Sequence, residues 1–136
     1  MILTNCAACA APLAHDAPRC IIVAAYNYAD SLHCQRRFEE GKALLRKIMP
    51  VARRVLGESN ATTLRMRRNY ARALYEDPAA TLDDLREAVT TLEDVERIAR
   101  RVFGGTHPLT VEIEDELRDA RAALLRARET PTPGSA

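Results

Sequence analysis

Aromatic side chains and glycine are scarce in this chain of 136 residues. Aromatic residues make up 4% of it, tryptophan is absent, and there are five glycines. A β-sandwich or β-barrel draws on many aromatic residues in its strands and on many glycines in its turns. The shortage of both therefore argues against an all-β fold.

Lysine is also scarce, and neither sign of charge is in excess. Two of the 20 basic side chains are lysines and 18 are arginines, against 19 acidic side chains, so the formal net charge is +1. Because general nucleic-acid binders carry a basic excess, we expect no nucleic-acid partner. The balance conceals an asymmetry: residues 1–75 carry a net charge of +7, and residues 76–136 carry one of −6.

Long hydrophobic runs are missing as well. The apolar run at residues 20–25 is far too short to cross a bilayer. The apolar start at residues 1–3 is too short for a signal peptide and has no basic segment before it. We therefore expect a cytoplasmic protein with no membrane partner. In that compartment, the four cysteines are expected to be thiols or metal ligands rather than disulfides.

Helix-forming residues are abundant. Hydrophobic residues make up 47% of the chain and charged residues 29%, which is the composition of a globular protein. There are 23 alanines and 18 arginines, and both residue types favour helices, as do leucine and glutamate. The composition therefore predicts an all-α fold.

Two internal repeats indicate that the helices come in pairs. Residues 52–57 read Ala-Arg-Arg-Val-Leu-Gly, and 47 positions later residues 99–104 repeat this string with Phe in place of Leu. Residues 27–32 and 69–74 share the pattern Asn-Tyr-Ala-x-x-Leu at an offset of 42. The segments that lead into the first pair of strings carry apolar residues every three or four positions, as amphipathic helices do. Small residues are expected where the helices approach closely: Ala29, Gly41, Ala71 and Ala88.

Five helices are expected, at residues 18–34, 37–56, 61–76, 82–103 and 108–128. Residues 1–17 show no helical period and are predicted to form an irregular leader, and residues 129–136 are predicted to form a flexible tail. Pro50 lies inside the second helix, where it removes a backbone hydrogen bond and should kink the helix.

Capping residues set the expected helix ends. Thr81 and Asp84 have the spacing of a capping box, while Gly57 and Gly104 follow helices at points where a left-handed residue is favoured. For two helices the sequence offers two possible N-caps each. The third helix can be capped by Ser59 or Asn60, and the fifth by Thr106 or His107, with Pro108 in its first turn.

The loop motifs resemble a known repeat family. Residues 103–110 read Phe-Gly-Gly-Thr-His-Pro-Leu-Thr, and residues 56–63 follow the same outline with Asn-Ala in place of His-Pro. Together with the two Asn-Tyr-Ala motifs and with Phe38 and Gly41, they resemble the tetratricopeptide repeat, in the longer form of kinesin light chains and nephrocystin-like proteins. The resemblance covers residues 18–128. It implies a right-handed helical-hairpin solenoid of about two and a half repeats.

The resemblance also implies a non-enzymatic scaffold or adaptor that binds a peptide or another protein chain. In that family, the first helix of each pair lines a concave groove, and the asparagine of an Asn-Leu-Ala motif faces the bound peptide. The matching residues here are Asn27 and Asn69. An amide side chain suits this role because it can both donate and accept a hydrogen bond.

Three arginines surround Asn69 on the third helix. Arg68 directly precedes it, and Arg65 and Arg72 lie one turn to either side. The three would give the groove a basic wall suited to an acidic ligand or a terminal carboxylate. The alternative is that they form ion pairs within the molecule. Their equivalents at the 47-residue offset are acidic: Glu112, Asp115 and Asp119.

The leader contains a candidate metal site. Zinc usually takes four nitrogen or sulfur ligands, and Cys6, Cys9, His15 and Cys20 could supply them. Only the Cys6–Cys9 pair has the usual close spacing, so the segment resembles the opening of a zinc ribbon or MYND-type finger whose remainder is missing. A zinc-binding adaptor is therefore one alternative function. The other interpretation is an unstructured leader with incidental thiols and no cofactor.

No catalytic motif is found in the sequence. There is no nucleophile elbow, phosphate-binding loop or metal-binding histidine pair, so we expect no enzymatic activity. A purely structural assembly subunit is a further alternative. Because so few repeats leave apolar faces uncovered on the first and fifth helices, we also expect self-association through the end helices, or a longer array of repeats.

Overall fold

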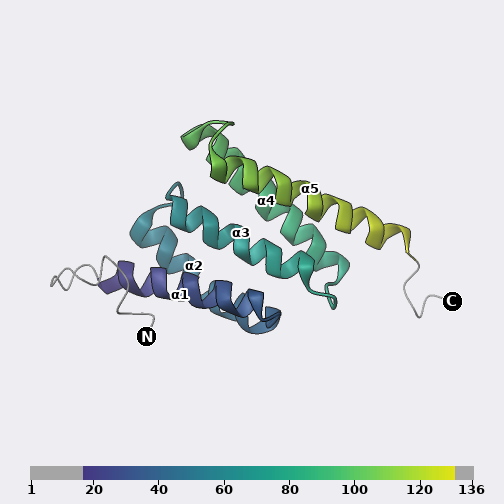
Figure 1. Cartoon of the computed structure of the whole chain (residues 1–136), viewed down its shortest axis with the longest axis horizontal. Coiled ribbons are helices and arrows are strands. Elements are labelled where there is room, and N and C mark those ends of the chain that lie inside the picture. Colours follow the sequence, from purple (N-terminus) through teal and green to yellow (C-terminus); the bar gives the residue numbers. More distant parts are fainter. Residues whose placement is uncertain (1–16, 131–136) are drawn as a thin grey trace.

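The computed structural model describes residues 17–130, and these residues form five α-helices and no strand (Figure 1). The predicted all-α fold is confirmed, and every helix boundary lies within one residue of its expected position. Ala17 and Glu129, which the sequence assigned to the leader and the tail, belong to the first and last helices. The helices are α1 (Ala17–Cys34), α2 (Phe38–Leu56), α3 (Ala61–Glu76), α4 (Leu82–Phe103) and α5 (Pro108–Glu129).

Side-chain caps fix the starts of three helices. The Asn60 side chain accepts a hydrogen bond from the Thr62 backbone N–H at 2.8 Å, and His107 Nδ1 accepts one from Leu109 at 3.1 Å. Asn60 and His107 are thus the caps, rather than Ser59 and Thr106. The predicted capping box at α4 is confirmed, because the Thr81 and Asp84 side chains each accept from the other residue's backbone N–H.

The two glycines of the internal repeat end their helices in the same way. Gly57 has a φ of 96° and Gly104 a φ of 89°, a region that side chains other than glycine rarely adopt. Each glycine N–H donates to the carbonyl four residues earlier, at Arg53 and Arg100 respectively. The repeated string is therefore a repeated helix ending.

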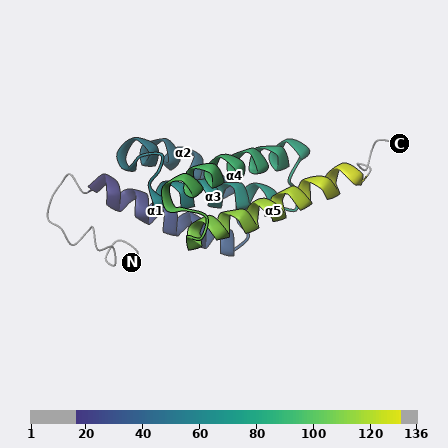
Figure 2. The same cartoon turned by 90° about the horizontal axis from the view of Figure 1, so that it is seen from above.

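Each helix packs against its neighbours in the chain, and α3 also packs against both α1 and α5. In Figure 1, α1, α3 and α5 lie nearer the viewer and run in the same general direction, with α2 and α4 behind them. Figure 2 agrees, since α2 and α4 lie along one side and α1 and α5 along the other. We call the surface that faces the viewer in Figure 1, formed by α1, α3 and α5, the front face.

Small residues lie where the helices meet, as expected. Ala29, Ala71 and Ala88 are buried, and a Cβ atom on Gly41 would lie 3.8 Å from the Ala29 carbonyl oxygen. Around them lies one continuous apolar core, whose largest fully buried members include Ile22, Leu45, Leu64, Met66, Leu74, Leu92, Val95 and Ile113.

The outermost helices keep exposed apolar side chains. Ile21 and Tyr28 on α1 are 56% and 46% exposed, and Val111 and Leu125 on α5 are 41% and 56% exposed. Apolar side chains are therefore exposed on both end helices, and the self-association expected from them stays a prediction. Among residues 17–130, no helix combines the length and the apolar character needed to cross a membrane.

Candidate functional site

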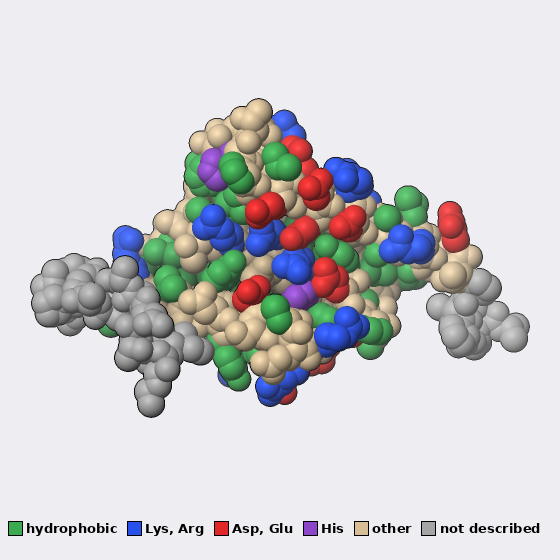
Figure 3. All heavy atoms as spheres, viewed as in Figure 1, with side chains coloured by type: hydrophobic (Ala, Val, Ile, Leu, Met, Phe, Trp, Pro, Cys, Tyr) green, Lys and Arg blue, Asp and Glu red, His purple; other side chains and the backbone are tan. Residues whose placement is uncertain are grey.

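The front face carries a central cluster of mixed charge. Figure 3 shows acidic and basic side chains intermingled over the middle of this face, with histidine at their edge. Three positions that are equivalent in the repeats lie on its three helices. They are Asn27 on α1, Asn69 on α3 at the 42-residue offset, and Glu116 on α5 at the 47-residue offset.

Asn69 is buried without hydrogen bonds. Its side chain is 4% exposed, and neither the Oδ1 nor the Nδ2 atom has a partner among the described residues. An unpaired buried polar group costs about 1–3 kcal/mol, so such groups are uncommon in folded proteins and call for an explanation. Asn27 differs, because it is exposed on α1. The two predicted asparagines, Asn27 and Asn69, therefore differ in burial.

Glu116 is a part of this cluster that the sequence interpretation missed. Its side chain is 16% exposed, and Oε1 lies 3.6 Å from the Nε atoms of both Arg68 and Arg72. Burial raises the pKa of this carboxyl from 4.5 to about 7, although the two arginines oppose the shift. Its other oxygen, Oε2, is buried and has no hydrogen-bond partner among the described residues.

The 47-residue offset could have identified Glu116. Carried forward from Asn69, it leads directly to this residue. The signal was missed because Glu116 replaces the asparagine of the motif and because glutamates on helices usually lie on solvated faces.

Two of the three predicted arginines form ion pairs within the molecule. Arg68 pairs with Glu112 at 2.5 Å as well as with Glu116, and Arg72 pairs with Glu76 at 3.7 Å as well as with Glu116. The alternative of internal ion pairs is therefore observed for these two arginines. No ion pair of Arg65 is present among residues 17–130.

The acidic partners are shifted from those that the repeat offset predicts. Arg68 meets Glu112 and Glu116 rather than Asp115, and Arg72 meets Glu116 rather than Asp119. Glu112 and Glu116 lie one turn apart on the side of α5 that faces α3. Asp115 lies outside that side and pairs with Arg118 of its own helix at 2.7 Å. Long side chains on a helix also lean toward the N-terminus of that helix. Two residues at equivalent positions of the repeat therefore need not be the ones whose charged groups meet.

A histidine and a tyrosine border the cluster. His33 Nε2 lies 2.6 Å from a carboxylate oxygen of Glu76, which links α1 to α3. Tyr75 follows on α3, and burial together with the charges of Glu116 and Glu76 raises the pKa of its hydroxyl. The front face is thus a polar network joining three helices, with Asn69 as its member without hydrogen bonds.

The predicted metal ligands fall mainly outside the described residues. Cys6, Cys9 and His15 lie in residues 1–16, and Cys20 is buried on α1 as a free thiol. Within the described part of the chain, no three cysteine, histidine or acidic side chains gather in a way that could hold a metal ion. The zinc hypothesis therefore stays a prediction.

Comparisons with known proteins add no relative. No family model matches the chain, and no curated protein and no solved structure matches it. The likeness to the tetratricopeptide repeat therefore rests on the residues of this sequence.

Proposed function

We propose that this protein is a non-enzymatic interaction module that binds a peptide segment of another protein on its front face. The observation that carries the proposal is Asn69, whose amide is buried but has no hydrogen-bond partner among the described residues. A peptide backbone offers both a donor and an acceptor, which is what an asparagine amide needs. A peptide reaches these two groups by displacing the side chains that cover them, and binding would then satisfy both and remove their cost.

The packing order supports a short helical-hairpin solenoid of the tetratricopeptide type. Each helix packs on the next one in the chain, and α3 also packs against α1 and α5, as stacked hairpins do. The matching helix endings at Gly57 and Gly104 add a structural repeat to the sequence repeat. In this architecture, α1, α3 and α5 line the groove.

The ion pairs bear on the choice of ligand. Arg68 pairs with Glu112, Arg72 pairs with Glu76, and both lie near the shared Glu116, so neither offers an uncompensated charge to an acidic ligand. Arg65 is the one predicted groove arginine without an ion pair among the described residues. We infer that main-chain hydrogen bonds and shape select the ligand more strongly than acidic side chains do.

The test starts from a random peptide library displayed on phage and selected on the immobilised full chain. Enriched peptides are then titrated calorimetrically against the wild type and Asn69→Ala. Loss of the amide should weaken binding by about tenfold, since two hydrogen bonds are worth about 1–2 kcal/mol. Thr90→Ala, an exposed change on α4, is the control and should leave the affinity unchanged.

Thermal stability separates a binding role of Asn69 from a structural one. Because the amide makes no hydrogen bond within the described residues, Asn69→Ala should melt at or above the wild-type temperature. Weaker peptide binding with unchanged or higher stability supports the proposal. The proposal fails if no peptide is enriched, if the enriched peptides bind Asn69→Ala as tightly as the wild type, or if the variant loses stability and affinity together.

A further inference from the structure

Two grooves of the molecule are equivalent in the repeat. One lies between α2 and α3 and the other between α4 and α5, and the 47-residue offset relates four pairs of residues that line them. The pairs are Met49 and Glu96, Arg53 and Arg100, Arg67 and Glu114, and Tyr70 and Leu117. The occupant of the first groove therefore indicates what the second one can hold.

Helix α4 packs over the first groove and makes specific contacts there. The Tyr70 hydroxyl donates to Glu87 of α4 at 2.9 Å and accepts from Arg46 of α2 at 3.0 Å. Arg67 pairs with Asp94 of α4 at 2.5 Å and holds the pKa of that carboxyl below its usual value. With α4 in place, a pocket of about 300 Å³ is left.

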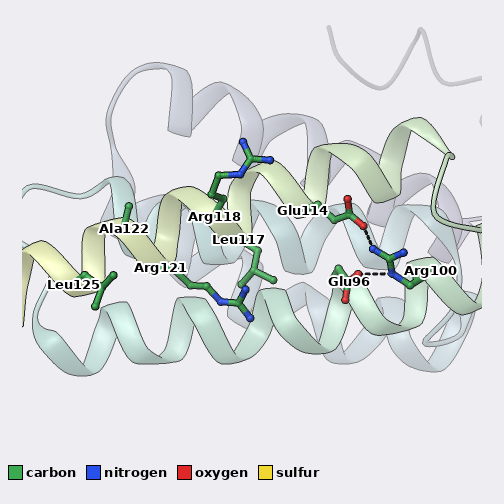
Figure 4. A pocket seen from close by; sticks show the side chains of 8 residues that line it. All are labelled: Glu96, Arg100, Glu114, Leu117, Arg118, Arg121, Ala122 and Leu125. Carbon is green, nitrogen blue, oxygen red and sulfur yellow. Dashed lines mark hydrogen bonds and ion pairs between the residues drawn. The ribbon is translucent and has the colours of Figure 1, made fainter.

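The second groove has no such helix among the described residues. Its pocket measures about 590 Å³, with Leu117, Ala122 and Leu125 as its apolar lining. Figure 4 shows Glu114 and Arg121 directed from α5 toward α4, with Arg118 directed away from α4. By equivalence with α4 on the first groove, the missing occupant is a helix antiparallel to α5.

The charges of α5 match an antiparallel copy of itself. Its first half, residues 108–117, carries four acidic side chains and no basic one, while residues 118–129 carry four arginines and two acidic side chains. Two antiparallel α5 helices therefore place an acidic half against a basic half on each side. The exposed apolar residues Val111 and Leu125 lie seven positions to either side of Arg118, so they meet in the same arrangement.

We propose that the α4–α5 groove binds α5 of a second copy of this chain, which forms a two-fold symmetric dimer. In this arrangement, Glu114 of each copy faces Arg121 of the other, and Val111 of each copy packs near Leu125 of the other. The same surface serves as groove and as occupant, which is the property of an isologous interface. The dimer goes beyond the proposed peptide binding and does not depend on it.

Glu114 and Arg121 form ion pairs within the chain that can be exchanged for ion pairs with a second copy. Glu114 pairs with Arg100, and Arg121 pairs with Glu93 at 2.8 Å. The four side chains are between 33% and 55% exposed. Surface pairs of this kind contribute little stability, so either charge can turn to a second copy at small cost.

Charge reversal tests the arrangement by sedimentation velocity over a concentration series of the full chain. The wild type should dimerise, and Glu114→Arg and Arg121→Glu alone should each raise the dissociation constant by about tenfold or more. An equimolar mixture of the two variants should associate again, because each contact then joins an arginine and a glutamate. The double variant should also recover. Arg54→Glu, the same charge reversal at an exposed position on α2, is the matched control.

Each outcome decides for or against the dimer. Recovery in the mixture, with helical circular dichroism unchanged in the single variants, supports antiparallel α5 pairing. A wild type that stays monomeric at every concentration overturns it. So does a mixture that associates no better than the single variants, or an Arg54→Glu variant that dissociates as they do.

Discussion

Ionisation of Glu116 links the stability of the front face to pH. Burial raises the pKa of its carboxyl from 4.5 to about 7. Between these values the folded protein holds a proton that the unfolded chain has released. Stability should therefore fall as the pH rises through this range, by at most about 3 kcal/mol, and level off above it.

Glu116→Gln keeps the shape of the side chain and removes its charge. The variant should match the wild type near pH 5 and melt at a higher temperature near pH 8, because the wild type alone carries a buried charge there. Glu112→Gln removes the other acidic partner of Arg68, and the Glu112 side chain is 58% exposed. Because its charge is the smallest of the causes that raise the Glu116 pKa, this variant should change the pH dependence only slightly. Thermal melts of the three proteins across this range check the expectation, and an unchanged pH dependence in Glu116→Gln would contradict it.

Sequence reasoning at the scale of single residues succeeded for apolar positions and failed for buried polar ones. The small residues expected where helices meet, Ala29, Ala71 and Ala88, are buried as predicted. The burial of Glu116 could not be inferred from its residue type, because glutamates on helices are usually solvated. It depends on how closely α3 and α5 approach and on where Arg68 and Arg72 end.

At the scale of elements, local capping chemistry defines the helices. The capping box of Thr81 satisfies two backbone N–H groups at the start of α4, so Thr81→Ala should cost about 1 kcal/mol. Thr90→Ala changes an exposed threonine in the same helix and should cost about 0.5 kcal/mol or less. Urea unfolding of both variants measures the difference, and equal losses would argue that the cap contributes nothing.

Helix ends were predictable because they follow from short-range rules. Gly57, Gly104, Thr81 and Pro108 all act within a few residues, and the boundaries they mark lie within one residue of those in the structure. The choice between Asn60 and Ser59 was not predictable in the same way. Both side chains can accept a hydrogen bond, and the backbone angles that select Asn60 are set by the whole turn.

At the scale of the whole molecule, the opposite charges of the two halves of the sequence meet within one chain. Arg68 and Arg72 of the basic half contact Glu112 and Glu116 of the acidic half. The repeat offset offered such ion pairs as one of two alternatives, and the small number of repeats predicted apolar surface at the ends. It could not reveal the open α4–α5 groove, whose volume depends on side-chain positions.

The proposed function is peptide binding on the front face through Asn69. The most direct measurement is a two-dimensional ¹H–¹⁵N NMR titration of the labelled full chain with a library-selected peptide. If the peptide binds there, the Asn69 side-chain amide signals shift together with backbone signals of α1, α3 and α5. Shifts confined to α2 and α4, or to the α4–α5 groove, with the Asn69 side-chain signals unmoved, would contradict it.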